Sequence, residues 1–379
     1  MKRIHLDHNA TTPLRPEARE TLLEALDAGL GNASSVHDAG RRARAVVDDA
    51  RERVAGALGI GEDEVVFTSG GTEANNLALR GALAAGPRGM GLVTSAIEHA
   101  AILEPAARMS EEGVRVDEIG VDREGQVDLE AIADIARRRP SLVSVMAANN
   151  EIGTTVDLPR LREAAGDRAV IHSDGAQLLG KRPIDLTSAG VDLMTLSAHK
   201  VGGPLGIGVL VRRGAVPLRA QLFGGSQEAE LRPGTENVPA IAAASVAIDL
   251  AVRETDEYAR HTSRLVSELW EGLVALVPDV RLNGPGLDDP TRLPNTLNVS
   301  AATGDARTLV VRLDLAGLEV SAGSACASGS LQPSHVLRAI GLDDERALSG
   351  LRISLGAGNT SADIHTCVER LGRILGEAS

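Results

Sequence analysis

Aromatic residues and cysteines are both scarce in this chain of 379 residues. Two Phe, one Tyr and one Trp make up its whole aromatic content of 1%, so binding of nucleic acid by base stacking is excluded. Two cysteines, Cys326 and Cys367, are too few for a disulfide framework. Neither has a C-x-x-C neighbour, and the nine histidines form no H-E-x-x-H pattern. We therefore expect no resident metal ion.

Long apolar runs and excess positive charge are missing as well. The most apolar long window, residues 238–252, is interrupted by Pro239, Ser245 and Asp249, so it is too short to span a bilayer. Residues 1–8 include two basic residues but no apolar stretch, unlike a signal peptide. The net charge of −13 repels phosphate backbones. These features predict a cytoplasmic protein without a membrane or direct nucleic-acid partner.

Short strand-like runs alternate with helical patterns over the first two-thirds of the chain. The predicted strands are 65–68, 92–94, 142–146, 169–172, 193–196 and 207–211. Between them lie amphipathic stretches such as 41–58. This alternation predicts an α/β fold with a mostly parallel sheet covered on both faces, and ligands bind at the carboxyl ends of strands in such sheets.

A second unit is expected after a long helical pattern over residues 238–276. A stretch rich in Pro, Gly and Asp follows at 283–290, and the pattern then shortens into an α+β unit. We place the domain boundary near residue 255. This gives a large domain of residues 15–255 and a smaller α+β domain of residues 1–14 and 256–379.

The stretch from Val65 to Asn76 is typical of a strand, a tight glycine turn and a helix N-terminus. Unpaired N–H groups and the positive end of the helix dipole at Gly71 and Thr72 suit a phosphate group. The turn lacks the Lys of a P-loop. The alternative is an ordinary turn in which Thr72 caps the helix.

Two charged residues follow predicted strands directly. Asp174 could cap a helix, or it could pair with a cationic heterocycle nitrogen such as that of a pyridoxal ring. Lys200 precedes a Gly/Pro turn, where a partly desolvated amine can attack a carbonyl carbon. The alternative for Lys200 is a solvated surface residue.

Two further residues, His99 and Cys326, carry potential chemistry. His99, after the strand at 92–94, suits proton transfer or stacking on a flat ring, although a structural histidine is the common case. Cys326 lies within ten consecutive small residues, 321–330, which predict a mobile loop with an exposed nucleophilic thiol. A packed turn with an inert cysteine is the alternative. Cys367 lies in a helical pattern and is expected in the core.

The order of these elements resembles fold-type I pyridoxal-phosphate enzymes, and five motifs resemble the cysteine desulfurases of the NifS and IscS type. The resemblance runs from about residue 4 to the C-terminus. Its motifs are Asp7-His8-Asn9-Ala10-Thr11-Thr12-Pro13, Thr68-Ser69-Gly70-Gly71-Thr72-Glu73-Ala74-Asn75-Asn76, Asn149-Asn150-Glu151-Ile152-Gly153, Arg232-Pro233-Gly234-Thr235 and Gly323-Ser324-Ala325-Cys326.

The resemblance implies a role for each candidate residue. Lys200 would bind pyridoxal 5′-phosphate covalently, His99 would stack on the ring and relay protons, and Asp174 would face the ring nitrogen. The other implied cofactor contacts are Gln177 with the ring hydroxyl, Asn150 beside the cofactor, and Gly71, Thr72, Ser197, His199 and, from a second subunit, Thr235 with the phosphate. Asn150 and Arg352 would bind the substrate carboxylate, a group that Arg matches with two donors.

The implied reaction converts L-cysteine to L-alanine and leaves the sulfur on Cys326 as a persulfide. A homodimer and a sulfur-acceptor protein, for iron–sulfur cluster assembly or for tRNA thiolation, are implied with it. Whether Cys326 also ligates an iron–sulfur cluster during transfer stays open. Two other enzyme activities, those of a selenocysteine lyase and of an aminotransferase of the same fold, remain as alternatives to the cysteine desulfurase. The alternative outside enzymes is a cofactor-free binding module.

Overall fold

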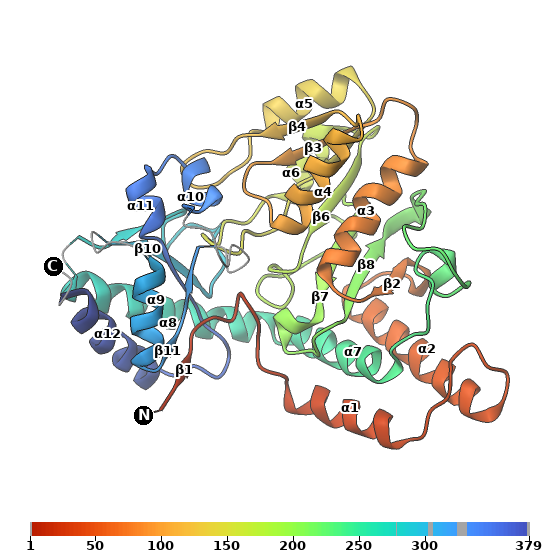
Figure 1. Cartoon of the computed structure of the whole chain (residues 1–379), viewed down its shortest axis with the longest axis horizontal. Coiled ribbons are helices and arrows are strands. Elements are labelled where there is room, and N and C mark those ends of the chain that lie inside the picture. Colours follow the sequence, from red (N-terminus) through yellow and green to blue (C-terminus); the bar gives the residue numbers. More distant parts are fainter. Residues whose placement is uncertain (1, 278, 302–305, 324–331, 377–379) are drawn as a thin grey trace.

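A computed structural model describes residues 2–277, 279–301, 306–323 and 332–376 (Figure 1). Its largest sheet has the strand order β2-β8-β7-β6-β5-β3-β4, in which β8 is antiparallel to both of its neighbours and the other pairs are parallel. The strands are β2 (Val65–Thr68), β3 (Gly91–Ser95), β4 (Val116–Ile119), β5 (Ser141–Ser144), β6 (Val170–Asp174), β7 (Leu193–Ser197) and β8 (Gly208–Arg212). All six predicted strands are present, and the mostly parallel α/β sheet is confirmed.

Helices cover both faces of this sheet because successive strand residues face opposite sides. In β2, Val65 and Phe67 belong to one hydrophobic core, whereas Val66 belongs to another. The core of Val66 includes residues of α3 (Gly71–Ala85) and α4 (Ala100–Glu111). The opposite core includes residues of α2 (Asp38–Leu58), α5 (Leu129–Arg138), α6 (Leu158–Ala165) and α7 (Val238–Arg253). The helix predicted over 41–58 is therefore confirmed as part of α2, and α1 (Pro16–Asp27) packs on α7.

A separate hydrophobic core surrounds an antiparallel sheet with the order β12-β13-β10-β9. Its strands are β9 (Arg281–Leu282), β10 (Thr296–Ser300), β12 (Ser321–Ala322) and β13 (Leu351–Ser354). The helices α8 (Thr255–Leu276), α9 (Ala306–Leu315) and α12 (Ser361–Gly376) contribute to this core and lie together at the left of Figure 1. Cys367 of α12 is fully buried there, and burial raises the pKa of its thiol to about 12. Its predicted place in the core is confirmed.

The N-terminal segment joins this second core rather than the first. Strand β1 (Ile4–His5) pairs in parallel with β11 (Leu318–Glu319), and Asp7 bridges to Ser354 of β13. The long helical pattern at 238–276 is two helices, α7 and α8, that meet at Glu254. The proposed domain limits near residue 255 stay a prediction.

The remaining elements are short. The helices α10 (His335–Ala339) and α11 (Asp344–Leu348) precede β13, and 3-10 turns lie at Glu62–Glu64 (η1), Ala198–Val201 (η2), Arg213–Ala215 (η3) and Glu228–Glu230 (η4). Across the ranges described, the structure contains no helix with the length and apolar character needed to cross a membrane.

Candidate active site

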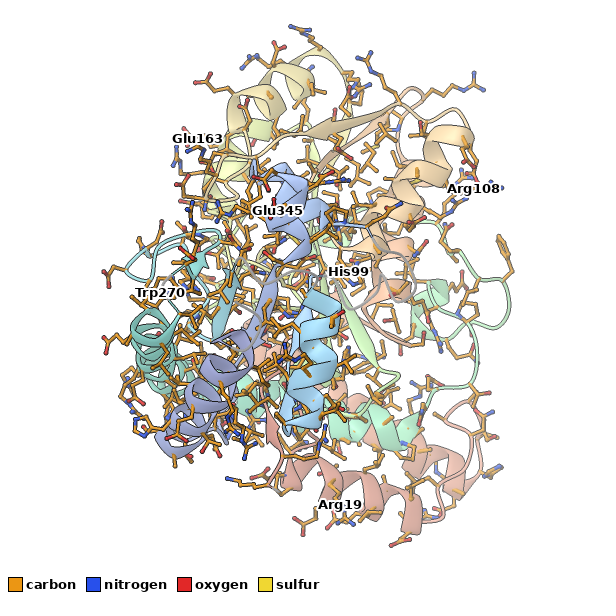
Figure 2. All side chains as sticks on the ribbon, turned by 60° about the vertical axis from the view of Figure 1, so that its left-hand side comes forward. Arg19, His99, Arg108, Glu163, Trp270 and Glu345 are labelled. Carbon is orange, nitrogen blue, oxygen red and sulfur yellow. The ribbon has the colours of Figure 1, made fainter. Side chains whose placement is uncertain are left out.

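A cavity of about 280 Å³ opens at the carboxyl ends of the central strands. Ten of the candidate site residues line it: Gly71, Thr72, His99, Asn150, Asp174, Gln177, Ser197, His199, Lys200 and Arg352. The view in Figure 2 has His99 near the middle of the molecule, whereas Arg19 and Arg108 lie at its periphery. Residues spread from Gly71 to Arg352 are thus brought to one site.

The turn between β2 and α3 forms one end of the cavity. Gly70 is the N-cap residue of α3, with φ of 153° and no side chain to accept from the first-turn N–H groups. A Cβ on Gly208 of the neighbouring strand would lie 2.5 Å from the carbonyl carbon of Gly70, so only glycine lets β8 approach this turn. The interpretation of Thr72 as the helix cap is therefore wrong. The helix N-terminus is left to an external anion.

The side chains beside this turn are hydrogen-bond donors without net charge. Ser197 at the end of β7 is 3% exposed. The Nδ1 atom of His199 lies 3.2 Å from the hydroxyl oxygen of Thr11, and burial lowers the pKa of His199 to about 4. Neutral donors at a helix N-terminus suit a phosphate group.

Asp174 presents a buried carboxylate at the end of β6. Its Oδ2 accepts a hydrogen bond from Nδ2 of Asn75 at 2.8 Å, and its Oδ1 accepts from the N–H of Ala176 at 3.0 Å. The residues after it form a turn and not a helix, so the helix-capping alternative is wrong. A carboxylate held in this way in a cavity suits a cationic ring nitrogen.

Lys200 lies in η2 with its side chain in the same cavity. Its Nζ donates to the backbone oxygens of Asn9 and Ala10, at 2.7 and 2.9 Å. Because the side chain is partly buried and lines the cavity, the surface alternative for Lys200 is wrong. The N-terminal segment thus holds the amine that the sequence singles out as a nucleophile.

His99 both caps a helix and faces the cavity. It is the N-cap residue of α4, and its Nδ1 accepts from the N–H of Ala101 at 3.0 Å. Burial lowers the pKa of His99, against the opposing effect of Asp174. The cap fixes the neutral ring with its proton on Nε2, which leaves that nitrogen as the proton donor.

Glu98, next to His99, is a fully buried carboxyl group. Its Oε1 accepts from the hydroxyl of Ser95 at 2.6 Å and from the N–H of Met146 at 2.9 Å. Burial is the main cause that raises the pKa of Glu98 to about 8. The group is therefore protonated near neutral pH.

Arg352 of β13 extends the cavity with a buried guanidinium group, 1% exposed. Its Nη2 donates to Oδ1 of Asp7 at 2.7 Å, and its Nη1 donates to the backbone oxygen of Asn150 at 3.2 Å. Its Nε is buried without a hydrogen-bond partner among the described residues. The guanidinium lines the cavity, where its other N–H groups suit the carboxylate of a ligand.

The N-terminal segment also organises Gln177. Nε2 of Gln177 donates to the backbone oxygen of Asn9 at 2.8 Å, and Nζ of Lys181 donates to Oε1 of Gln177.

Sequence reasoning missed Asn9, Asn75 and Lys181 as site residues. The first two lie inside the motifs quoted above, and Lys181 is one of only three lysines in the chain.

Thr235, predicted to act from a second subunit, and Cys326 are the remaining predicted site residues. Thr235 is exposed and does not line it. Cys326 lies outside the described residues, as does the stretch 324–331 of the predicted mobile loop. The residues on either side are described. Ser321 donates to Oδ2 of Asp7 at 2.8 Å, and Ser334 donates to Oε2 of Glu151 at 2.6 Å.

These donors and acceptors fit pyridoxal phosphate. An uncapped helix N-terminus suits its phosphate, the carboxylate of Asp174 suits its ring nitrogen, and Lys200 supplies an amine. The guanidinium of Arg352, which lines the same cavity, suits a substrate carboxylate. Among the residues described, no group of His, Cys, Asp and Glu is arranged to hold a metal ion.

Comparisons with known proteins agree with this fit. The family model described as Aminotransferase class-V matches residues 4–367. "Cysteine desulfurase IscS" of Dictyoglomus turgidum is 41% identical over 99% of this chain and 95% of its own length. "Putative cysteine desulfurase IscS 1" of Bacillus subtilis is 38% identical over 99% of both chains. A solved structure titled "NIFS-LIKE PROTEIN" superposes with a TM-score of 0.92 and 35% identity, over 99% of this chain and 100% of its own.

The matches span nearly the whole chain in sequence and in structure, and three of the five motifs that carry the resemblance contribute residues to the cavity. The chain therefore belongs to the class-V aminotransferase family and, within it, to the cysteine desulfurases of the NifS and IscS type.

Proposed function

We propose that this protein is a pyridoxal-phosphate-dependent cysteine desulfurase that converts L-cysteine to L-alanine and transfers the sulfur to Cys326. The observation that carries the proposal is the convergence of Lys200, Asp174 and Arg352 on one cavity whose end is an uncapped helix N-terminus. No one of these residues identifies the chemistry by itself. Together they supply an amine, a partner for a cationic ring nitrogen and a donor for a substrate carboxylate.

The cofactor would be held at both ends. Gly71, Thr72, Ser197 and His199 would bind the phosphate, with Thr235 of a second subunit completing the site in a homodimer. Asp174 would keep the ring nitrogen protonated, because a buried carboxylate favours the charged form of a neighbouring base. When bound, pyridoxal phosphate supplies an electron sink for the substrate α-carbon.

The chain's own residues would bind the substrate and move its protons. Arg352, oriented by Asp7, and Asn150 would hold the carboxylate of L-cysteine. The amine of Lys200 would take the α-proton. His99, fixed by its cap with the proton on Nε2, would relay protons to and from the substrate.

The sulfur step would use Cys326 as nucleophile. Its thiolate attacks the substrate sulfur, the bond between that sulfur and the β-carbon breaks, and a sulfur–sulfur bond forms on the enzyme. The electron pair of the broken bond stays with the β-carbon, which takes up a proton and becomes the methyl group of L-alanine. The sum is L-cysteine plus thiol giving L-alanine plus persulfide.

The persulfide would then pass to an acceptor protein, either an iron–sulfur scaffold or a tRNA-thiolation enzyme, in the cytoplasm. Both kinds of acceptor begin from the same persulfide, so the proposal covers both.

The paired variants Cys326→Ser and Cys367→Ala test the proposal, because they remove the two cysteines of the chain one at a time. After incubation with L-cysteine, we expect protein-bound persulfide in Cys367→Ala and none in Cys326→Ser. Undiminished sulfur release by Cys326→Ser would instead contradict sulfur transfer to Cys326 and favour the selenocysteine lyase alternative. A protein that stays colourless with added pyridoxal phosphate would indicate a binding module.

A further inference from the structure

Lysine is rare in this chain, and one of its lysines is buried behind the cavity. Among 39 Lys and Arg residues, lysine occurs only as Lys2, Lys181 and Lys200. Lys2 is exposed, and Lys200 carries the role already described. Lys181 is 2% exposed, a placement that is rare for lysine without a specific role.

The nitrogen of Lys181 contacts two neutral amide oxygens. It donates to Oδ1 of Asn9 at 2.8 Å and to Oε1 of Gln177. Asn9 is itself fixed, because its Nδ2 donates to Thr296 at 2.8 Å and its Oδ1 also accepts from Asn295 at 3.1 Å. The nitrogen of Lys181 therefore sits in a rigid frame.

These contacts determine which way the amide of Gln177 faces. The nitrogen of Lys181 donates to one end of the amide, and the carbonyl oxygen of Asn9 can only accept from the other. Oε1 must therefore face Lys181, and Nε2 must face Asn9. One hydrogen of Nε2 is used by Asn9, and the second remains for the cavity that Gln177 lines.

We propose that Lys181 is a positioning residue that clamps Gln177 so that this amide can only donate, and not accept, toward the cofactor's ring oxygen. The proposal rests on the proposed function, since it requires bound pyridoxal phosphate. A donor favours the ionised form of an oxygen. Lys181 thereby stabilises the ionised ring oxygen through Gln177, without touching the cofactor.

The clamp does not depend on the charge of Lys181. The charged groups that face it are Lys200 and Arg352, and its own charge acts on His8. Burial, with Lys200 and Arg352 nearby, lowers the pKa of Lys181 well below its ordinary value. A neutral amine still carries the two hydrogens that Asn9 and Gln177 accept.

The test is a double-mutant cycle read from the colour of the holoenzyme. Lys181→Met, Gln177→Leu and the double variant are loaded with pyridoxal phosphate, and the pH midpoint of the visible absorbance is measured. We expect each single variant to raise the midpoint by about one pH unit, because the ring oxygen loses an oriented donor. The double variant should show the same rise and not the sum, because Lys181 acts through Gln177. The exposed Lys2→Met is the control and should match the parent.

Two outcomes would overturn the clamp: an unchanged midpoint in Lys181→Met, or shifts that add in the double variant, which indicate a direct charge effect. Lys181→Leu, which also lacks a donor, replaces Lys181→Met in the cycle if the latter does not fold. The parent enzyme separates the two proposals. A colourless parent that makes no alanine refutes the proposed function and the clamp together, whereas a coloured, active parent with unshifted variants refutes the clamp alone.

Discussion

Replacing Arg352 with alanine should weaken carboxylate binding in particular and not ligand binding in general. The guanidinium is 1% exposed, and two of its nitrogens already bind Asp7 and Asn150. The guanidinium also lines the cavity, so the remaining N–H groups of Nη1 and Nη2 are the donors expected for a ligand carboxylate. L-Alanine, the product, carries the carboxylate in question, and ethylamine has the same amine and two carbons without it.

The size of the effect follows from the hydrogen bonds that are lost. A hydrogen bond to a charged partner contributes about 1.5–3 kcal/mol. Two of them, discounted for the desolvation of the carboxylate, amount to about 3 kcal/mol, which corresponds to roughly 100-fold in the ratio of dissociation constants. We therefore expect Arg352→Ala to reduce the preference for L-alanine over ethylamine by roughly 100-fold.

Spectral titration of the bound cofactor with each ligand measures this ratio. Any general disturbance of the site by the unpaired Asp7 would weaken the binding of both ligands equally, so it cancels in the ratio of their dissociation constants. Arg3→Ala, which removes a half-exposed guanidinium paired with Asp314 and Glu319, is the matched control and should leave the ratio unchanged. An unchanged preference in Arg352→Ala would refute the role of Arg352 in carboxylate binding.

Three further predictions follow from buried carboxyl groups. Asp174→Ala should lower the rate of alanine formation by about 100- to 1,000-fold, measured by steady-state kinetics; a smaller loss than tenfold would contradict pairing with the ring nitrogen. The pKa of Glu98 is raised from 4.5 to about 8, so its contribution to the free energy of unfolding should be complete below pH 4.5. This contribution should fall by about 4 kcal/mol as the pH rises to 8. Urea unfolding at several pH values should show this decrease, and Glu98→Gln should remove it. The same dependence of the unfolding free energy on pH in the parent and in Glu98→Gln would refute the assignment. Glu228→Ala, which removes the acceptor of Nη2 of Arg51 and of the N–H of Phe67, should cost about 3 kcal/mol in the same assay, and a cost below about 1 kcal/mol would count against it.

The sheet was predictable because its strands are buried on both faces. Runs such as Val65–Thr68 and Leu193–Ser197 are nearly continuous in apolar and β-branched residues, and such runs have few other structures open to them. Lys200, Asp174 and His99 were placed by the same logic, because each follows such a strand. The pattern at 238–276 shows the limit of periodicity. It continues across Glu254, where the chain breaks into two helices.

The supporting contacts of the site could not be predicted, because they join residues far apart in the chain. Asp7 and Arg352 are separated by 345 positions, and Asn9 and Lys181 by 172. No local sequence pattern indicates either contact, because each depends on how the N-terminal segment crosses between the two cores. Asp7 and Asn9 lie in a motif that marks family membership, but the motif does not state their partners. Gln177 was predicted to contact the cofactor, whereas its orientation by Lys181 is visible only in the structure.

The central claim is that the amine of Lys200 and the thiol of Cys326 act on the same bound substrate. Incubation of the holoenzyme with limiting L-cysteine, followed by alanine quantification and peptide mass spectrometry, tests it most directly. The account predicts one alanine for each added sulfur atom, with that sulfur on the peptide that contains Cys326. Added sulfur confined to the peptide of Cys367, or alanine formed without sulfur on the protein when no reductant is present, would contradict it.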